Sequence, residues 1–334
     1  MTNFLSDYPR LWSVILAGNE SSTLDPFITL WQGSHTPKQF CTFVGTRSLL
    51  QHTWDLADQF SHPENKMTVV TQPFLHQTCR QLGGRVPGLI VTEPFHNGSL
   101  TSALLGIAAV RAQDPDSTIV LYPCQSFIHP EHQFLHAIQR AAEAAKFLNG
   151  LVILLGAHSN YSIGRYGWLR TKGHLGWASK IPVDEIEISP NLPFPADTTM
   201  KTPSIPPPSI LFNSGIVLAK TEILWDLCQA LFPAIIQNLE SLGSLTGRPE
   251  KQNLKALAFK QIPRGCFWRD FLGKIPKHLA MIEMRGVTWS DWEDPGHIAD
   301  TLSLLGRKPA FPVEWFTRHP DRQPSSQPNQ EVKT

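Results

Sequence analysis

Apolar and polar positions alternate along the first half of the chain in blocks of two sizes. Short apolar runs predict buried strands at residues 14–18, 67–71, 89–91, 118–121 and 151–155. Between these runs lie longer segments with apolar residues at helical spacing, at residues 48–57, 102–110 and 131–147. This order of strands and helices is typical of a mostly parallel sheet with helices on both faces. The predicted fold class is therefore α/β.

The second half of the chain is less regular. Residues 189–209 contain seven prolines, which are incompatible with a helix or a central strand and indicate an exposed loop or insertion. We expect strands at residues 210–212 and 279–284, and helices at residues 221–242, 251–259, 267–272 and 295–305. Residues 319–334 are polar and rich in Pro, Ser and Gln, and are predicted to be a disordered tail.

Composition narrows the class of protein. The 334 residues carry a formal net charge of +1 and no cluster of Lys and Arg, which argues against nucleic-acid binding. The five cysteines are widely spaced and form no C-x-x-C pair, which argues against a disulfide framework and a structural zinc site. No apolar run approaches the length of a membrane span. We therefore expect a cytoplasmic protein with neither a membrane nor a nucleic acid as its partner.

One stretch near the amino terminus combines a buried strand with polar and cationic residues. The apolar run at residues 14–18 ends abruptly in Asn19-Glu20-Ser21-Ser22-Thr23, and Lys38 follows within Pro37-Lys38-Gln39-Phe40. A loop after a parallel strand lies at the edge of the sheet where α/β proteins bind ligands. Together the two segments resemble the opening signature of the sugar-1-phosphate nucleotidyltransferases, L-A-G-G-x-G-T-R-L-x-P followed by P-K-Q-F. The most similar branch is that of the mannose-1-phosphate guanylyltransferases.

Six further motifs of that family are matched in the same order along nearly the whole chain. The family's G-x-x-S-L-L-Q-x-T, E-P-x-N-R-G-T-A-P-A, P-A-D-H, Y-G-W-I-E, W-N-S/T and G-V-G-W-S-D-W are similar to residues 45–53, 93–102, 123–126, 166–170, 212–215 and 286–292. The resemblance implies a Rossmann-like nucleotidyltransferase fold in a single domain over residues 1–318. Its nucleotide-binding half would span about residues 10–160, and its sugar-binding and carboxyl-terminal helical half about residues 161–318.

The resemblance also implies a reaction and a set of site residues. A nucleoside triphosphate (GTP in this branch) and a sugar-1-phosphate would give a nucleotide sugar, such as GDP-mannose, and pyrophosphate. Catalysis of this kind depends on positioning and on neutralising phosphate charge. Lys38 would act as the phosphate-neutralising catalytic cation, and Asp291 would hold Mg²⁺. The nucleotide would be lined by Leu16, Ala17, Gly18 and Gly98, and the sugar by Tyr166, Gly167 and Asn213.

Several positions depart from the family pattern. Asn19 and Ser21 replace two glycines of the phosphate loop, and Thr23 replaces its Arg, which removes a bidentate phosphate contact. Gln125 replaces one metal-binding carboxylate, and Arg170 reverses the charge of the Glu in the sugar segment. Two functions stay open: a divergent nucleotidyltransferase, or a catalytically silent relative that binds a nucleotide or a partner protein. Together the losses predict weak or absent turnover.

The candidate residues also have purely structural explanations. Lys38 could be a solvated surface lysine, and Asp291 could cap a turn or a helix. Cys124 ends a predicted strand and is expected to be a small buried residue and not a nucleophile. The acidic residues within 184–187 are most simply a solvated edge. Core packing is expected for the tryptophans of the carboxyl-terminal part, Trp289, Trp292 and Trp315.

Overall fold

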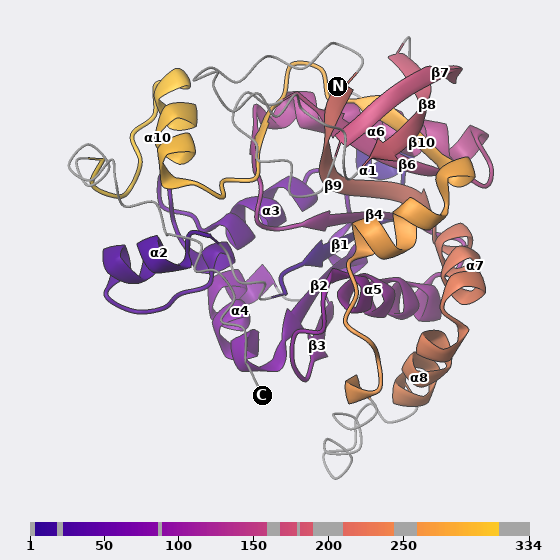
Figure 1. Cartoon of the computed structure of the whole chain (residues 1–334), viewed down its shortest axis with the longest axis horizontal. Coiled ribbons are helices and arrows are strands. Elements are labelled where there is room, and N and C mark those ends of the chain that lie inside the picture. Colours follow the sequence, from indigo (N-terminus) through magenta and orange to yellow (C-terminus); the bar gives the residue numbers. More distant parts are fainter. Residues whose placement is uncertain are drawn as a thin grey trace, which may run out of the picture.

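The computed structural model describes residues 4–18, 23–85, 89–158, 168–178, 181–189, 210–243 and 259–313. Within these residues the main sheet contains β1 (Leu11–Leu16), β2 (Lys66–Thr71), β3 (Leu89–Glu93), β4 (Thr118–Pro123), β6 (Val152–Ala157), β7 (Trp168–Ala178), β8 (Ile181–Ser189), β9 (Ile210–Lys220) and β10 (Leu279–Glu283). The spatial order is β3-β2-β1-β4-β9-β6-β10-β8-β7, and β7 also pairs with β9 (Figure 1).

Parallel pairing dominates the amino-terminal half of the sheet. β1 pairs in parallel with β2 and β4, and β2 pairs in parallel with β3. β9 is antiparallel to both of its main neighbours, β4 and β6, while β6 and β10 are parallel. The carboxyl ends of β1 and β4 therefore meet at one edge of the sheet. The predicted α/β class with a mostly parallel sheet is confirmed.

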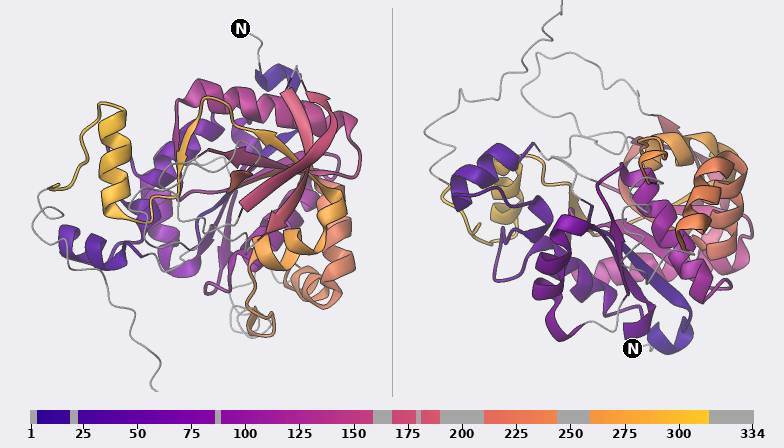
Figure 2. Two further views of the ribbon diagram at one scale, coloured as in Figure 1. Left: turned by 45° about the horizontal axis from the view of Figure 1, so that its top comes forward. Right: turned by 90° about the horizontal axis from the view of Figure 1, so that it is seen from below.

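Helices cover both faces of this sheet, as the sequence pattern predicts (Figure 2). One face packs against α3 (Leu49–Ala57), α4 (Leu75–Leu82) and α6 (Glu131–Phe147). The other face packs against α5 (Ser99–Gln113), α7 (Thr221–Leu231) and α8 (Pro233–Gly243). Alternate side chains of β1 point to opposite faces: Leu11 and Ile15 enter the first apolar cluster, and Trp12, Val14 and Leu16 enter the second.

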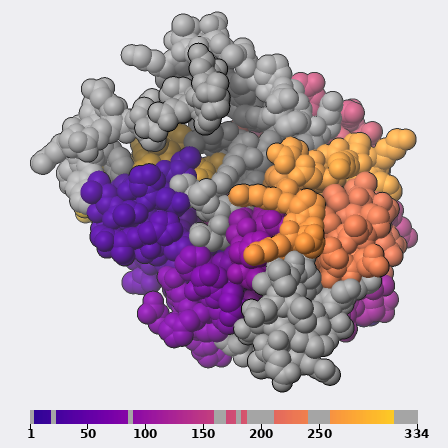
Figure 3. Space-filling view, turned by 60° about the horizontal axis from the view of Figure 1, so that its bottom comes forward, coloured from indigo at the N-terminus to yellow at the C-terminus, as the bar shows by residue number. Residues whose placement is uncertain are grey.

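The second face is extended by residues near the carboxyl terminus. Apolar side chains of residues 259–275 join α7 and α8 in the same apolar cluster. This segment includes a short π-helix, η6 (Phe267–Phe271), within the predicted helix at residues 267–272. Figure 3 shows the segment in orange, lying on the surface beside the α7–α8 region. Its position brings Gly265 against the start of α5, where Gly265 O accepts from Leu100 N at 3.1 Å.

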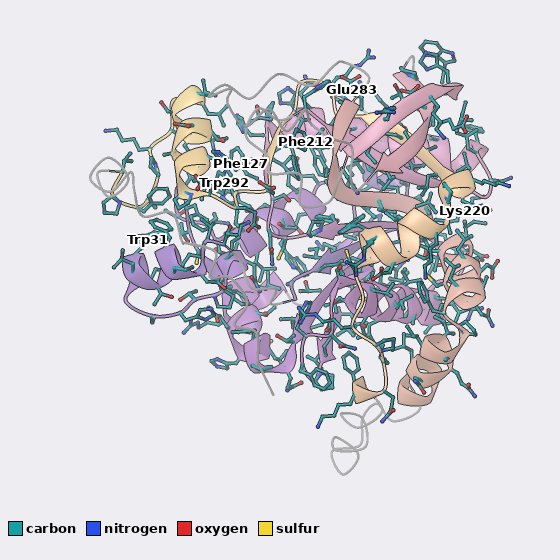
Figure 4. All side chains as sticks on the ribbon, in the orientation of Figure 1. Trp31, Phe127, Phe212, Lys220, Glu283 and Trp292 are labelled. Atoms are coloured by element: carbon teal, nitrogen blue, oxygen red, sulfur yellow. The ribbon has the colours of Figure 1, made fainter. Side chains whose placement is uncertain are left out.

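A third apolar cluster lies beside the main sheet and joins distant parts of the chain. It contains residues of α2 (Asp25–Gln32), residues of α10 (Pro295–Leu304), and the aromatic rings of Phe43, Phe127 and Trp292. A separate two-stranded antiparallel sheet, β5 (Phe127–His129) with β11 (Thr288–Ser290), leads into this cluster. In Figure 4 the rings of Phe127 and Trp292 lie next to each other near α10. Their centroids are 4.4 Å apart and the rings are nearly parallel.

The remaining helical elements are short. They are α1 (Phe4–Asp7) and the 3-10 turns η1 (Lys38–Phe40), η2 (Pro63–Asn65), η3 (Gln72–Phe74), η4 (Gly83–Arg85), η7 (Leu272–Lys274) and η8 (Pro276–His278). Among the helices that the structure describes, none has the length and apolar character that a bilayer crossing needs.

Several local predictions can be compared with the structure. Ser48 caps α3 through a reciprocal capping box with Gln51, and α6 has the predicted bounds. The expected helix at 221–242 is divided into α7 and α8, because Pro233 has no backbone N–H to continue α7. The β7–β8 hairpin was not predicted. The expectation of a solvated acidic edge is wrong for Asp184, which is buried in β8 and bonded to His174.

Some predictions fall outside the described residues. These include almost all of the Pro-rich stretch at residues 189–209, most of the expected helix at 251–259, and the tail at 319–334. The division of the chain into a nucleotide-binding half and a sugar-binding half stays a prediction, as does the cytoplasmic location.

Candidate functional site

The turn after β1 lies at the sheet edge where β1 and β4 end. Leu16 and Gly18 contribute to a pocket there, while Ala17 is buried below it and donates its N–H to Val69 O at 2.8 Å. A Cβ at Gly18 would lie 3.0 Å from His96 Nδ1, so this position requires a glycine or a shift of the imidazole. Asn19 and Ser21 lie outside the described residues.

The pocket measures about 400 Å³ when its open mouth is included. Its lining residues are Leu16, Gly18, His96, Ser99, Ser102, Pro123, Gln125 and Trp268. Among the described residues, the pocket is lined by hydroxyl, amide, imidazole, aromatic and apolar groups, and by no carboxylate or ammonium group.

Lys38 lies in the interior close to this pocket. It is 1% exposed, so the explanation as a solvated surface lysine is wrong. Its Nζ donates to Glu293 Oε1 at 2.8 Å and also to the backbone carbonyl of Asp291. The neighbouring Gln39 donates from Nε2 to the carbonyls of Ala17 and Gly18 at 3.2 and 3.4 Å. The P-K-Q segment is thus tied both to the turn after β1 and to the carboxyl-terminal motif.

Glu293 binds a second residue from the phosphate-loop region. Thr23 Oγ1 lies 3.2 Å from Glu293 Oε2 and also donates to the backbone carbonyl of Glu293. Thr23 stands where the family signature has its Arg. Two positions that the resemblance associates with phosphate binding, Lys38 and Thr23, therefore converge on one carboxylate of this chain.

Asp291 and Gln125 are the residues in the two metal-binding positions of the family motifs. Both are buried, and the β5–β11 pairing brings the segments that carry them together. Gln125 donates from Nε2 to Gly18 O at 3.4 Å, which leaves Oε1 as its only potential metal ligand. The neighbouring Lys38 ammonium group donates to the carbonyl of Asp291 itself.

This donor set fits a resident Mg²⁺ poorly. Mg²⁺ prefers an octahedron of hard oxygen ligands and is usually held by one or two carboxylates with substrate phosphates. Here the two family positions supply one carboxylate, Asp291, and one neutral amide, Gln125, and the Lys38 ammonium group bonds to the backbone carbonyl of Asp291. Within the described ranges no group of three or more His, Cys, Asp or Glu side chains is arranged to hold a metal ion.

Gly98 has a role in backbone packing. It precedes α5 with φ +89°, and a Cβ there would lie 2.2 Å from Gly265 O. Only a glycine combines this conformation with such a close approach of two backbones. Gly98 is not among the residues that line the pocket. Its predicted contact with a nucleotide stays a prediction.

The predicted sugar-lining residues are only partly described. Asn213 is buried in β9, where its Oδ1 accepts from Gly215 N at 3.0 Å beside the register shift in the β6–β9 pairing. Tyr166 and Gly167 lie outside the described residues. Arg170, which follows them in the motif, is exposed on β7. The structure therefore does not bring these residues together as one site, and their contact with a sugar stays a prediction.

Sequence reasoning missed Glu293, His96, Ser102 and Trp268. His96 and Ser102 lie within the segment that resembles the family's E-P-x-N-R-G-T-A-P-A motif, so the sequence did contain a signal that could have placed them near Gly18. Glu93, at the start of that motif, is fully buried with Oε2 4.0 Å from His96 Nδ1. Glu293 had no such signal except its place two residues after Asp291.

Two structural predictions for this region are confirmed. Cys124 is fully buried, and burial raises its pKa to about 12, so its thiol is neutral and unsuited to nucleophilic attack near neutral pH. Trp289 and Trp292 are buried core residues. Trp315 lies outside the described residues.

Comparisons with known proteins bear on this site. No family model matches the chain. The xanthan biosynthesis protein XanB of Xanthomonas campestris pv. campestris is 27% identical over 166 residues in strain B100 and 29% identical over 160 residues in strain ATCC 33913. These alignments cover 49% and 47% of this chain. They span only about a third, 34% and 32%, of the length of the curated relatives.

Solved structures match over much more of the chain. A structure described as mannose-1-phosphate geranyltransferase from Thermus thermophilus has a TM-score of 0.66 at 16% identity, covering 89% of this chain and 79% of the other. One described as mannose-6-phosphate isomerase from Helicobacter pylori has a TM-score of 0.61 at 13% identity, covering 84% and 99%. The inositol-1-phosphate CTP transferase of T. maritima has a TM-score of 0.50 at 12% identity, covering 89% and 95%. The chain thus has the sugar-phosphate nucleotidyltransferase fold that its sequence motifs predict.

Proposed function

We propose that this protein is a catalytically silent relative of the mannose-1-phosphate guanylyltransferases that keeps a pocket for the nucleoside part of a nucleotide or nucleotide sugar. The observation that carries the proposal is the buried ion pair between Lys38 and Glu293. The cation that nucleotidyl transfer would place against phosphate is already neutralised by a carboxylate of the same chain.

Charge accounts for the expected loss of turnover. Attack on the α-phosphorus of a triphosphate requires cations and a metal to stabilise the negative charge that is redistributed in the transition state. In this site Lys38 is paired, and Thr23 and Gln125 are neutral. Each such stabilising contact contributes several kcal/mol in enzymes of this kind, so that the combined losses leave little activity.

The same losses affect nucleoside binding much less. The pocket lies at the carboxyl edge of β1 and β4, where open α/β sheets bind their ligands. Trp268 and His96 offer ring surfaces, and Ser99 and Ser102 offer hydroxyl groups for hydrogen bonds. The alignment with XanB and the likeness to a mannose-1-phosphate enzyme support a ligand from sugar-nucleotide metabolism.

A divergent enzyme with weak turnover is the second candidate. It would convert GTP and mannose-1-phosphate to GDP-mannose and pyrophosphate, with Mg²⁺ entering together with the triphosphate. The retention of both Lys38 and Asp291 in the interior of the site favours this candidate.

A silent protein would exert its effect through a bound nucleotide or through a partner protein.

Pyrophosphate release separates the two candidates. Purified protein would be incubated with Mg²⁺, mixed nucleoside triphosphates and a panel of sugar-1-phosphates that includes mannose-1-phosphate, with an Asp291→Asn variant as the control. We expect no release above background, together with measurable binding of a nucleoside or nucleotide sugar in equilibrium titrations. Release by the wild-type protein that disappears in Asp291→Asn would show a working site and contradict the silent-relative proposal.

A further inference from the structure

The carboxylate of Glu293 lies beside the buried cation of this site, the Lys38 ammonium group. The Lys38 and Glu293 side chains are 1% and 5% exposed, and Lys38 Nζ lies 2.8 Å from Glu293 Oε1. The second carboxylate oxygen is 3.2 Å from the hydroxyl of Thr23. One carboxylate therefore receives hydrogen bonds from the two side chains that stand at the phosphate-binding positions of the signature.

The backbone on both sides of Glu293 is fixed. Trp292 has φ +47°, a conformation that is rare for a residue with a bulky side chain. Its ring is stacked on Phe127 with a centroid distance of 4.4 Å (Figure 4). It also packs edge-on against Phe43 at a centroid distance of 5.7 Å. On the other side, Asp294 caps α10 by accepting from His297 N at 3.1 Å. These contacts hold the Glu293 side chain toward Lys38.

Glu293 thus supplies, from within the protein, the negative charge that a bound phosphate would bring to Lys38. A phosphate that approached Lys38 would meet a buried carboxylate at hydrogen-bond distance from that lysine, and the two negative charges would repel each other away from solvent. In the part of the chain that the structure describes, the residues that line the neighbouring pocket include no carboxylate or ammonium group. A ligand without a polyphosphate can enter that pocket and leave the ion pair intact.

Building on the proposed function, we infer that Glu293 determines ligand specificity: it fills the phosphate position, so that the pocket accepts nucleosides or ligands of low charge and rejects polyphosphates. Glu293 bonds to Lys38 and is not among the described residues that line the pocket, so its removal should change anion binding and leave nucleoside binding the same. A general disruption of the site would instead weaken the binding of anions and nucleosides alike.

Inorganic pyrophosphate is the probe, because it tests the anion position without knowledge of the base. It would be titrated calorimetrically, without Mg²⁺, into the full-length wild-type protein, Glu293→Gln, and the double variant Lys38→Met/Glu293→Gln. The matched control is Glu222→Gln, which neutralises a partly exposed carboxylate paired with Arg111 at 3.1 Å. We expect Glu293→Gln to bind pyrophosphate at least about tenfold more tightly than the wild type, and the control and double variant to show no gain.

Thermal melting provides a second measurement if Glu293→Gln is unstable. Pyrophosphate replaces the missing anion in our interpretation, so it should raise the melting temperature of Glu293→Gln and not that of the double variant. Three results would overturn the inference: equal pyrophosphate affinity in the wild type and Glu293→Gln, a gain that persists without Lys38, or a Glu293→Gln protein that stays unfolded at saturating pyrophosphate. Failure of nucleoside binding in the wild type would contradict the proposed function alone.

Discussion

Removal of one partner from the Lys38–Glu293 pair should destabilise the protein far more than removal of both. Lys38→Met keeps the length and apolar stem of the lysine but leaves the Glu293 carboxylate buried, with its cation gone. Glu293→Leu leaves the ammonium group in the same situation. Each single substitution should lower the free energy of unfolding by about 3–5 kcal/mol, since an uncompensated buried charge is left behind. That loss is a large part of the total stability of about 5–15 kcal/mol of a typical domain.

The double variant Lys38→Met/Glu293→Leu buries no charge at this position. Apolar replacement of a whole buried ion pair is often nearly neutral. The hydroxyl of Thr23 loses its carboxylate acceptor, and the carbonyl of Asp291 loses the Lys38 ammonium group, which together cost about 2 kcal/mol. We therefore expect the double variant to be about 2 kcal/mol less stable than the wild type, compared with about 6–10 kcal/mol if the two single effects were additive.

The four proteins would be compared by urea unfolding followed by tryptophan fluorescence, with the slope of the free energy against urea checked for constancy. Lys220→Met is the matched control. Lys220 is partly buried, and among the contacts in the described residues its Nζ bonds only to Asn149 Oδ1, at 3.0 Å. Loss of this bond should change stability by about 0.5 kcal/mol or less. A cost below about 1 kcal/mol for Lys38→Met would refute the reasoning, because the pair would then be solvated.

Three further predictions concern the frame around the site. Gly98→Ala should lower the free energy of unfolding by about 3 kcal/mol or more in urea melts, because the new methyl group would meet Gly265 O at φ +89°. Ser48→Ala removes the cap of α3 and the hydrogen bond from Ser48 Oγ to Gln81 Oε1 at 2.6 Å, and should cost about 1–2 kcal/mol in the same assay. Iodoacetamide at pH 8 should label exposed Cys79 but not buried Cys124, as read by mass spectrometry of the native protein. Because burial raises the Cys124 pKa to about 12 in the folded state, its contribution to stability should be complete below its ordinary value of 9.0 and be lost as the pH rises toward 12. Labelling of Cys124 without unfolding, or full stability at pH 11, would contradict the assigned burial.

Periodicity made the amino-terminal half of the fold predictable. β2, α3 and α6 lie at or within a residue of their expected positions, because apolar residues recur there with an unbroken period. In the β7–β8 hairpin the alternation is interrupted by register shifts near Gly173 and Gly176, so its sequence shows no regular strand period. These bulges explain why the hairpin was missed.

The site was predictable only in its parts. Motif resemblance singled out Lys38, Asp291 and Gly18, which the structure places near one sheet edge. It could not reveal that Glu293 pairs with Lys38, since nothing local marks a carboxylate that bonds to a residue 255 positions away. The close approach of Gly98 to Gly265 could not be predicted either, because Gly265 is distant in sequence and carries no pattern of its own.

The ion pair between residues 38 and 293 also constrains how the molecule folds. A contact across 255 positions closes a very long loop. Contacts of this kind form late in folding, because the chain loses conformational entropy on closing the loop before the contact stabilises it. During synthesis the amino-terminal strands emerge long before Glu293, so the nascent sheet has a lysine at its edge that must stay hydrated until the carboxyl-terminal segment arrives. The ion pair at the edge of the site therefore forms only when the whole fold is completed. A ribosome-bound chain that stops before residue 293 should remain sensitive to proteases near residue 38.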